Sequence, residues 1–195
     1  MNNKIILASR SGVRKKILNE HGIECEVIPA DIDEDSIKRT LLDQGTDPTG
    51  VSKNLAELKS IKISNKVQNK YVLGADSVID FNGELISKPK NRNGALNTLK
   101  KLNGKSHQLV SSVCISLNGV MIWNYTDAST LTMKKLSFGE IEIYLKNIKD
   151  KELYAYGVYQ IEANGRYLFS KVKGDENTIM GLPAKQIKEY LSSLK

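Results

Sequence analysis

Short apolar runs alternate with helically spaced apolar positions along the first part of the chain. An apolar run at 5–8 predicts a buried strand, and the polar turn 9–12 leads into a helix with its apolar residues on one side. The same signals predict a strand at 25–28, a helix at 51–59 and a buried strand at 71–74. An acidic segment, 31–35, follows the strand at 25–28.

Turn and capping signals define the rest of the chain. Asn118-Gly119 joins two alternating segments, which predicts a β-hairpin. Ser137 and Glu140 form a capping box ahead of an amphipathic segment. Apolar residues at helical spacing predict three helices, at 95–102, 141–148 and 187–194. Because hairpins and crossovers both occur, we predict an α/β fold with a mixed sheet flanked by helices.

The composition is that of a globular protein. The chain has 195 residues, of which 40% are hydrophobic and 26% charged, so disordered, collagen-like and coiled-coil classes are excluded. We expect residues 1–195 to form one domain. No apolar run is long enough for a membrane span or a signal peptide, which favours a cytoplasmic protein without membrane contact. Cys25 and Cys114 lack metal-ligand spacing and are expected to be buried reduced thiols.

The net charge raises the question of a nucleic-acid partner. The chain has 29 basic and 22 acidic residues, giving a formal charge of +7. The cations are mostly lysines, scattered singly and in pairs among acids, whereas base recognition favours clustered arginine. Nucleic-acid binding is therefore disfavoured. A nucleotide fits a few well-placed cations equally well.

The turn after the first strand carries two hydroxyls and an arginine. Ser9 and Ser11 lie at a strand-to-helix turn, where free backbone N–H groups and the helix dipole attract anions. Arg14, on the first helical turn, could clamp a phosphate. The alternative is that one serine only caps the helix and Arg14 is a solvated side chain. The segment lacks the lysine of a P-loop.

Three further candidates follow. The segment Gly74 to Ser77 comes directly after the apolar run 71–73, so we expect its Asp76 at the carboxyl end of a central strand. There it could hold a divalent metal or accept a proton, or simply turn the chain. Pro89 fixes the chain beside Lys88, which could meet a phosphate or be solvated. Glu34 could supply a second carboxylate or lie in an exposed acidic loop.

The remaining candidates carry little chemistry. His21 and His107 have no partner spacing and are interpreted as structural or surface residues. No G-x-S-x-G elbow occurs, so a nucleophilic serine is disfavoured.

Taken together, these segments resemble the Maf family of nucleotide pyrophosphatases along essentially the whole chain. The N-terminal pattern L-A-S-x-S-x-x-R is matched from Leu7 to Arg14. The other family motifs follow in order, as Asp33-Glu34, Leu55-Ala56 with Lys59, Gly74-Ala75-Asp76-Ser77, Lys88-Pro89, Asn103 to His107, Gly157-Val158-Tyr159-Gln160-Ile161-Glu162, Gly174-Asp175 and Gly181-Leu182-Pro183.

The resemblance implies hydrolysis of a nucleoside triphosphate between its α- and β-phosphates, giving a monophosphate and pyrophosphate with a divalent metal, Mg or Mn. It implies two lobes around a substrate cleft, as in Maf and ITPase-like folds, and a possible homodimer. Family members cleanse non-standard or modified nucleotides and are linked to cell-division arrest.

The resemblance also implies residue roles. Asp76 falls on the catalytic proton acceptor, and Glu34 and Asp76 fall on acidic metal positions. The substrate-binding positions fall on Arg14, Lys59 and Lys88 for phosphate and on Ser9, Ser11 and Gln160 for the pocket.

The chain departs from the family pattern at four positions. Val13 replaces the usual arginine before Arg14, which removes one positive charge. Ser77 replaces threonine and keeps the hydroxyl, Ser87 replaces glycine and Ser60 replaces alanine. We expect these changes to affect affinity and substrate choice. A nucleotide- or nucleic-acid-binding regulator without catalysis remains the alternative hypothesis.

Overall fold

The computed structural model describes residues 4–150, 153, 157–161 and 163–194. Strands and helices alternate along the first half, with the bounds β1 Ile5–Leu7, α1 Gly12–Glu20, β2 Cys25–Val27, α2 Glu34–Asp43, α3 Pro48–Ser64, β3 Val72–Phe81, β4 Glu84–Ile86 and α4 Arg92–Leu102. The second half begins with a long hairpin, formed by β5 Ser106–Leu117 and β6 Val120–Met133. It continues as α5 Phe138–Lys146, the 3₁₀ helix η1 Asn164–Leu168, β7 Phe169–Lys173, α7 Glu176–Ile179 and α8 Ala184–Ser193.

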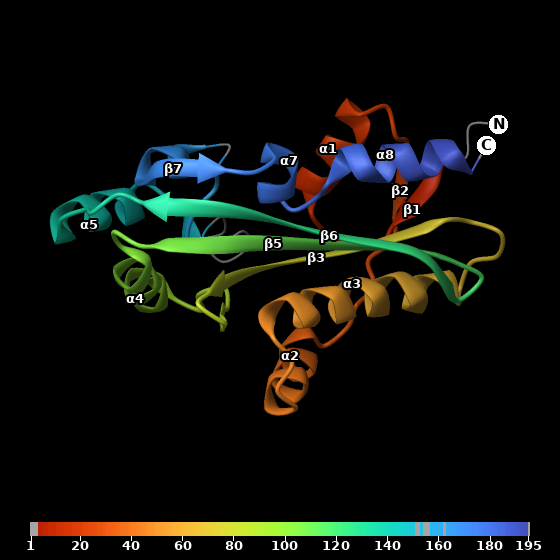
Figure 1. Cartoon of the computed structure of the whole chain (residues 1–195), viewed down its shortest axis with the longest axis horizontal. Helices are drawn as coiled ribbons and strands as arrows, with labels where there is room; N and C mark the ends of the chain where they lie inside the picture. Colours follow the sequence, from red (N-terminus) through yellow and green to blue (C-terminus); the bar gives the residue numbers. More distant parts are fainter. Residues whose placement is uncertain (1–3, 151–152, 154–156, 162, 195) are drawn as a thin grey trace.

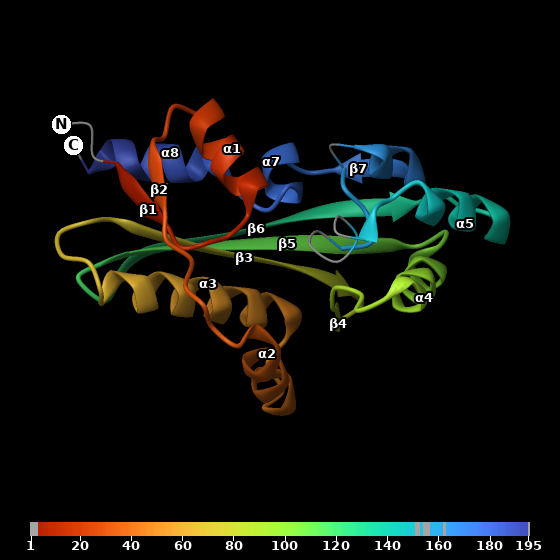
Figure 2. The ribbon, with the colours of Figure 1, turned by 180° about the vertical axis from the view of Figure 1, so that it is seen from behind.

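The seven strands of the described residues form one mixed sheet in the order β2-β1-β3-β5-β6-β7, with β4 paired to β3 beside that path. β1 is parallel to β2 and β3, whereas β3, β5, β6 and β7 pair antiparallel. α3 packs beneath β3 and β5, and α1 and α8 lie on the other side of the strands (Figures 1 and 2). The sheet is therefore covered on both faces where β1 joins it.

Alternation along β3 sends its side chains to two different faces. Val72 packs with Ile6 and Ile63 in the core on the α3 side. Leu73 packs with Leu18 and Ile187 in the core under α1 and α8. Successive residues of a strand point to opposite faces, so this division continues further along β3.

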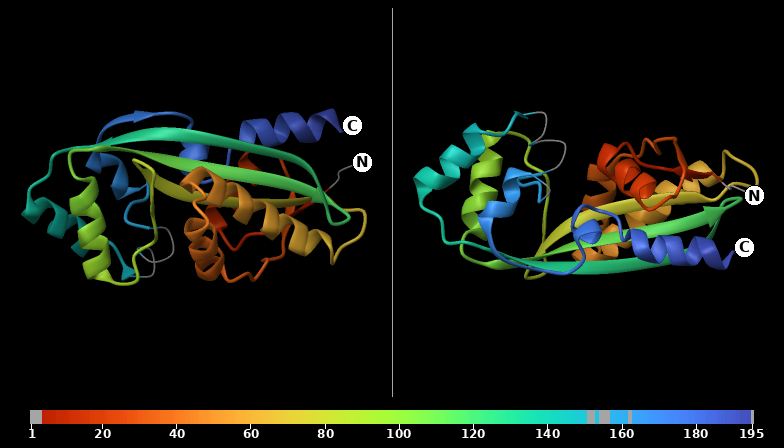
Figure 3. Two further views of the ribbon diagram at one scale, coloured as in Figure 1. Left: turned by 60° about the horizontal axis from the view of Figure 1, so that its bottom comes forward. Right: turned by 90° about the horizontal axis from the view of Figure 1, so that it is seen from above.

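The long strands connect two lobes. One end carries α1, α3 and α8, and the other carries α4, α5 and β7 (Figure 3). A separate core fills the second lobe and contains Leu99, Leu131 and Leu168, all 0% exposed. Met180 packs against the cores of both lobes. The expected two-lobed α/β fold with a mixed sheet is confirmed.

One edge of β3 is left open between the lobes. β1 pairs with β3 only as far as Leu73, and β4 begins its pairing at Ile79. Both strands use the same edge, because β5 occupies the other edge from Val72 to Asp80. Among the residues that the structure describes, the backbone from Gly74 to Val78 therefore has no strand beside it on that edge, and polar groups can reach it there.

Most predicted elements are confirmed, including the Asn118-Gly119 hairpin and the Ser137 capping box. α2 was not among the elements that the apolar pattern predicts.

Cys25 and Cys114 are free and buried, and burial raises the pKa of each thiol. No helix in the described ranges is long and apolar enough to cross a membrane.

Candidate active site

Asp76 lies in the middle of β3, and the prediction that it ends a strand is wrong. The short apolar run stops at Gly74, but the strand continues because antiparallel pairing with β5 holds the polar residues in register through Asp80. Asp76 still faces an opening, because β1 has already left this edge of β3 at Leu73. The site therefore lies at a gap in the strand pairing along β3 and not, as the sequence predicts, at the end of a strand.

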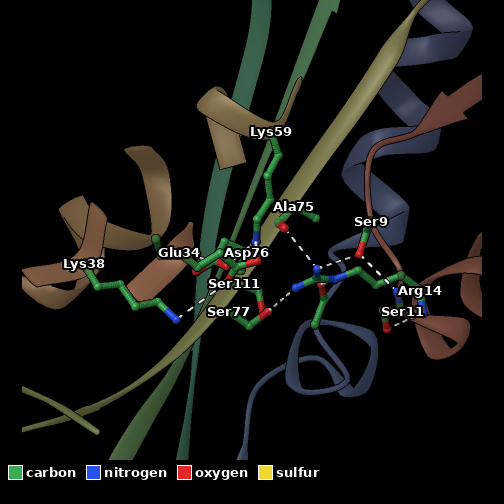
Figure 4. A network of polar contacts seen from close by, with 12 residues as sticks. Ser9, Ser11, Arg14, Glu34, Lys38, Lys59, Ala75, Asp76, Ser77 and Ser111 are labelled. Carbon is green, nitrogen blue, oxygen red and sulfur yellow. Dashed lines mark hydrogen bonds and ion pairs between the residues drawn. The ribbon is translucent and has the colours of Figure 1, made fainter. Parts of the chain in front are cut away.

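A buried lysine joins two carboxylates at this gap. Lys59 Nζ donates to Asp76 Oδ1 at 2.7 Å and lies 2.8 Å from Glu34 Oε1 (Figure 4). The side chains of Lys59 and Asp76 are only 8% and 6% exposed, so each charge depends on the other for compensation. The second oxygen, Asp76 Oδ2, is buried without a hydrogen-bond partner in the described structure. It is the acceptor that this network leaves free.

Local sequence explains how the two helices deliver these groups. Asp33 caps α2 by accepting from the Ser36 N–H, which places Glu34 in the first helical turn. Asp47 caps α3 and Pro48 starts it. Lys59 follows Leu55 by four residues and so shares its inward face, pointing toward β3. Glu34 therefore does not lie in an exposed acidic loop.

Arg14 forms a second network on the opposite face of β3. Its Nε donates to Gly181 O at 2.9 Å, and its Nη1 donates to Ala75 O at 2.9 Å and to Ser9 Oγ at 3.1 Å (Figure 4). Its Nη2 donates to Ser77 Oγ at 3.0 Å. Most donors of the guanidinium thus bind protein atoms, so Arg14 is not a solvated side chain.

Hydroxyl groups extend the Arg14 network into the molecule. Ser77 Oγ lies 2.9 Å from Ser111 Oγ, which donates to Thr178 O at 2.8 Å. Ser11 caps α1 by accepting from the Arg14 N–H at 3.3 Å. The departure at Ser77 therefore keeps a hydroxyl that the site uses. Ser60 instead bonds Val72 O and Ser116 Oγ in the interior, so its contribution is to packing.

The two networks meet in a cleft of about 490 Å³. Residues from both lobes line it, because Ile179 and Tyr159 belong to the second core while Arg14 and Lys59 belong to the first lobe. All eight predicted site positions line the cleft, namely Ser9, Ser11, Arg14, Glu34, Lys59, Asp76, Lys88 and Gln160. Glu162, predicted in the same motif as Gln160, lies outside the described residues.

Charged groups in the cleft shift the pKa values of their neighbours. Burial works to raise the pKa of Glu34, but attraction and hydrogen bonding by Lys59, aided by Lys38 and Lys88, lower it overall. Partial desolvation within the cleft lowers the pKa of Lys88, and repulsion by Arg14 and Lys38 adds to the effect. Cations thus face one another around two carboxylates, which suits a polyanionic ligand.

Two residues of the site were missed by sequence reasoning. Lys38 lines the cleft one helical turn after Glu34, at 3.7 Å from Glu34 Oε2. Ser111 links Ser77 to Thr178 across the sheet. The i, i+4 spacing of Ile37 and Leu41 could have revealed α2 and hence Lys38. Nothing local marks Ser111.

The donor set agrees with a hard divalent cation shared with a ligand. Within the described ranges, no group of three or more histidine, cysteine, aspartate or glutamate side chains gathers to hold a metal. Two carboxylates do meet, and the unpartnered Asp76 Oδ2 is a hard oxygen donor. Mg²⁺ is commonly held by one or two carboxylates together with phosphate oxygens and water, so the residues present fit such an ion.

The histidines are structural, as expected. His107 is buried, and its Nε2 lies 2.7 Å from the Tyr159 hydroxyl. His21 Nδ1 lies 2.9 Å from Ile17 O at the end of α1. Neither ring lines the cleft.

A mixed α/β sheet, two lobes and a cleft with paired carboxylates and converging cations define a class of protein suited to a polyanionic ligand. Residues 4–194 match the family model described as Maf-like protein. The chain is 63% identical over 195 residues to a nucleoside triphosphate pyrophosphatase of Pelagibacter ubique (strain HTCC1062), covering 100% of both proteins. The chain therefore belongs to the Maf family.

Two other similarities are more distant. A 7-methyl-GTP pyrophosphatase of Brucella abortus biovar 1 (strain 9-941) is 37% identical over 183 residues, which are 94% of this chain and 92% of that protein. The structure of a HAM1 protein from Coxiella burnetii aligns with a TM-score of 0.52 at 13% identity, covering 97% of this chain and 98% of that one. This structural similarity concerns the fold alone.

Proposed function

We propose that this protein hydrolyses nucleoside triphosphates between the α- and β-phosphates, releasing a nucleoside monophosphate and pyrophosphate. The proposal is supported by the relatives named nucleoside triphosphate pyrophosphatase and 7-methyl-GTP pyrophosphatase. The observation that carries it is the buried, unpartnered Asp76 Oδ2 in a cleft lined by Lys38, Lys59 and Lys88.

In this mechanism the Asp76 carboxylate accepts a proton from the attacking water. Lys59 holds Asp76 Oδ1 at 2.7 Å, which fixes the orientation of the carboxylate for that step. The cations of the cleft offset the charge that develops on the leaving pyrophosphate. Arg14 keeps Ser9 and Ser77 in place beside the reacting groups.

A divalent cation, Mg or Mn, is part of the proposal. Asp76 and Glu34 would hold it together with phosphate oxygens. When bound, such an ion supplies Lewis-acid stabilisation of the phosphoryl charge. We also propose that Gln160 and Ser11, both in the cleft lining, contact the nucleotide.

The test is a product assay. The purified protein is incubated with canonical and modified nucleoside triphosphates, 7-methyl-GTP included, with Mg²⁺ or Mn²⁺ and with a chelator. Pyrophosphate and monophosphate in equal amounts, lost on chelation, are the expected result. Orthophosphate as the main product would contradict the cleavage position, and activity that survives chelation would contradict the metal.

The Asp76→Asn variant tests the proton acceptor. Asparagine keeps the shape and a hydrogen-bond acceptor for Lys59 but has no carboxylate, so we expect turnover to fall by about a thousandfold or more. The matched control is Asp80→Asn, further along the same strand, where the carboxylate only accepts from the Gly83 N–H in the β3–β4 turn. Substantial turnover in Asp76→Asn would remove this residue from the proposed role.

A binding protein without catalysis is the rival. It predicts no product from any nucleotide and tight, salt-sensitive binding to long nucleic acid. The buried Asp76–Lys59–Glu34 arrangement favours the enzyme, because a site that only binds anions gains nothing from two carboxylates.

A further inference from the structure

The cations of the cleft differ in how many hydrogen-bond donors they have left for a ligand. Arg14 donates to Ser9, Ala75, Ser77 and Gly181. Lys59 is buried and directs its ammonium at both carboxylates, at 2.7 and 2.8 Å. Both groups are thus largely occupied with protein atoms, so a polyphosphate needs other donors.

Lys38 is placed to supply them. Its side chain lies on α2, lines the cleft and is 17% exposed. Its ammonium lies 3.7 Å from Glu34 Oε2, beyond a good hydrogen bond, and makes no other ion pair within the described parts of the chain. The charge is therefore held over the cleft by Coulomb attraction while its N–H donors remain available.

The neighbouring residues support the same placement. Arg39, the next residue on α2, is exposed and donates from Nε to Asp35 O at 3.4 Å. Val13, the cleft residue beside Arg14, packs with the apolar core under α1 and α8 and adds no charge. Lys38 also lowers the pKa of Lys88, so the two ammonium groups share one region of the cleft. An anion between them would relieve that repulsion.

We propose that Lys38 is a substrate-binding residue that contacts the polyphosphate chain from the α2 side of the cleft. The inference rests on the proposed function, because it assigns the polyphosphate as the ligand. It deepens that function by adding a cation that the sequence motifs do not mark. Glu34 then has two lysine partners with different roles. Lys59 holds it in place, whereas the ammonium of Lys38 interacts with both Glu34 and the ligand.

The test measures binding of inorganic pyrophosphate, with Mg²⁺ present, by titration calorimetry. Lys38→Gln should weaken binding about tenfold, as expected for loss of one charge-assisted hydrogen bond. Lys38→Arg should restore most of the affinity. Arg39→Gln is the matched control, because it removes a neighbouring charge from the same helix, and should bind like the unaltered protein.

A second comparison separates ligand contact from simple neutralisation of Glu34. In a Glu34→Gln background, Lys38 has no carboxylate to offset. If Lys38 contacts the ligand, adding Lys38→Gln still weakens pyrophosphate binding about tenfold. If that second substitution has no effect, Lys38 acts only through Glu34 and the inference is overturned. Unchanged affinity in Lys38→Gln alone, or no binding of pyrophosphate by the unaltered protein, overturns it as well.

Kinetics with the best triphosphate provide an independent readout. Lys38→Gln should raise KM about tenfold and change kcat much less, whereas damage to the Asp76 network would lower kcat. The outcomes distinguish the two proposals. Pyrophosphate binding that depends on Lys38 in a protein that hydrolyses no nucleotide would refute the proposed reaction and keep the assignment of Lys38.

Discussion

His107 is a buried titratable group that the proposed chemistry does not use. Burial lowers its pKa from 6.5 to about 4, and its Nδ1 is buried without a partner in the described structure. The neutral ring suits this site, because the Tyr159 hydroxyl bonds Nε2 at 2.7 Å and a second N–H has no acceptor. His107 therefore couples acid stability to the segment that carries Tyr159 and Gln160.

The sign of this coupling gives a prediction. Above pH 6.5 the ring is neutral in both the folded and the unfolded chain, so it adds no pH dependence. Between pH 6.5 and about 4 only the unfolded chain gains the proton, and the free energy of unfolding should fall by roughly 3 kcal/mol. Urea unfolding of the native protein and of His107→Gln, at neutral and mildly acidic pH, measures this. An equal acid-induced loss in both proteins would refute it.

Residue-level predictions from the sequence were strongest for position and weakest for contacts. All eight candidate residues line one cleft because the resemblance places each of them by its motif, whereas the strand end that the local pattern predicts at Asp76 is wrong. The partners of Arg14 were not predictable, because Gly181 lies 167 residues away and its approach depends on the packing of α7 and α8 against α1. Lys59 meets Asp76 only once α3 is packed on β3.

At the level of elements, α3 and β3 approach each other unusually closely at Gly74. A Cβ at Gly74 would lie 2.1 Å from Ala56 O and 2.7 Å from Ser60 N, both backbone atoms of α3. The helix can come this near only because glycine has no side chain. This contact sets the distance at which Lys59 reaches Asp76, two residues along the strand.

Gly74→Ala should therefore affect both stability and the site. The added methyl group must push α3 away from β3, which we expect to lower the free energy of unfolding by about 3 kcal/mol and to reduce turnover. Gly139→Ala in α5 is the matched control, because nothing lies within 4 Å of its Cβ position. Alanine there should be neutral or stabilise the helix by up to about 1 kcal/mol. Denaturant unfolding measures the free energy of unfolding of both variants. Equal values for Gly74→Ala and Gly139→Ala would contradict the close-packing argument.

Elements were predictable where a local signal is complete. The capping box at Ser137 and the Asn118-Gly119 turn each specify their element within a few residues. α2 was missed because none of its residues is buried and its apolar positions are few. The length of β3 was missed because Asp76 and Ser77 interrupt the apolar pattern, and they do so because they face polar networks and not a core.

At the scale of the whole molecule, Arg14 joins three parts of the chain at the open edge of β3. Its guanidinium connects α1 with Ala75 and Ser77 on β3 and with Gly181 between α7 and α8. Ala75 O lies in the stretch of β3 that has no strand of the described residues along its open edge, so the arginine takes the place of a missing ladder partner there. The hydrogen bonds of Arg14 therefore hold these three parts of the cleft wall together.

Arg14→Lys should therefore destabilise the protein although the positive charge is kept. A lysine cannot reach these four acceptors at once, and carbonyl groups left unpaired cost about 1–3 kcal/mol each when buried. We expect a loss of about 2 kcal/mol in the free energy of unfolding, together with lower turnover, because the Ser9 and Ser77 hydroxyls lose their common donor. A residue that only clamps phosphate predicts the opposite pattern, with unchanged stability and a raised KM. Urea unfolding and steady-state kinetics on the same preparation separate the two, with Lys15→Gln, an exposed neighbour on α1, as control.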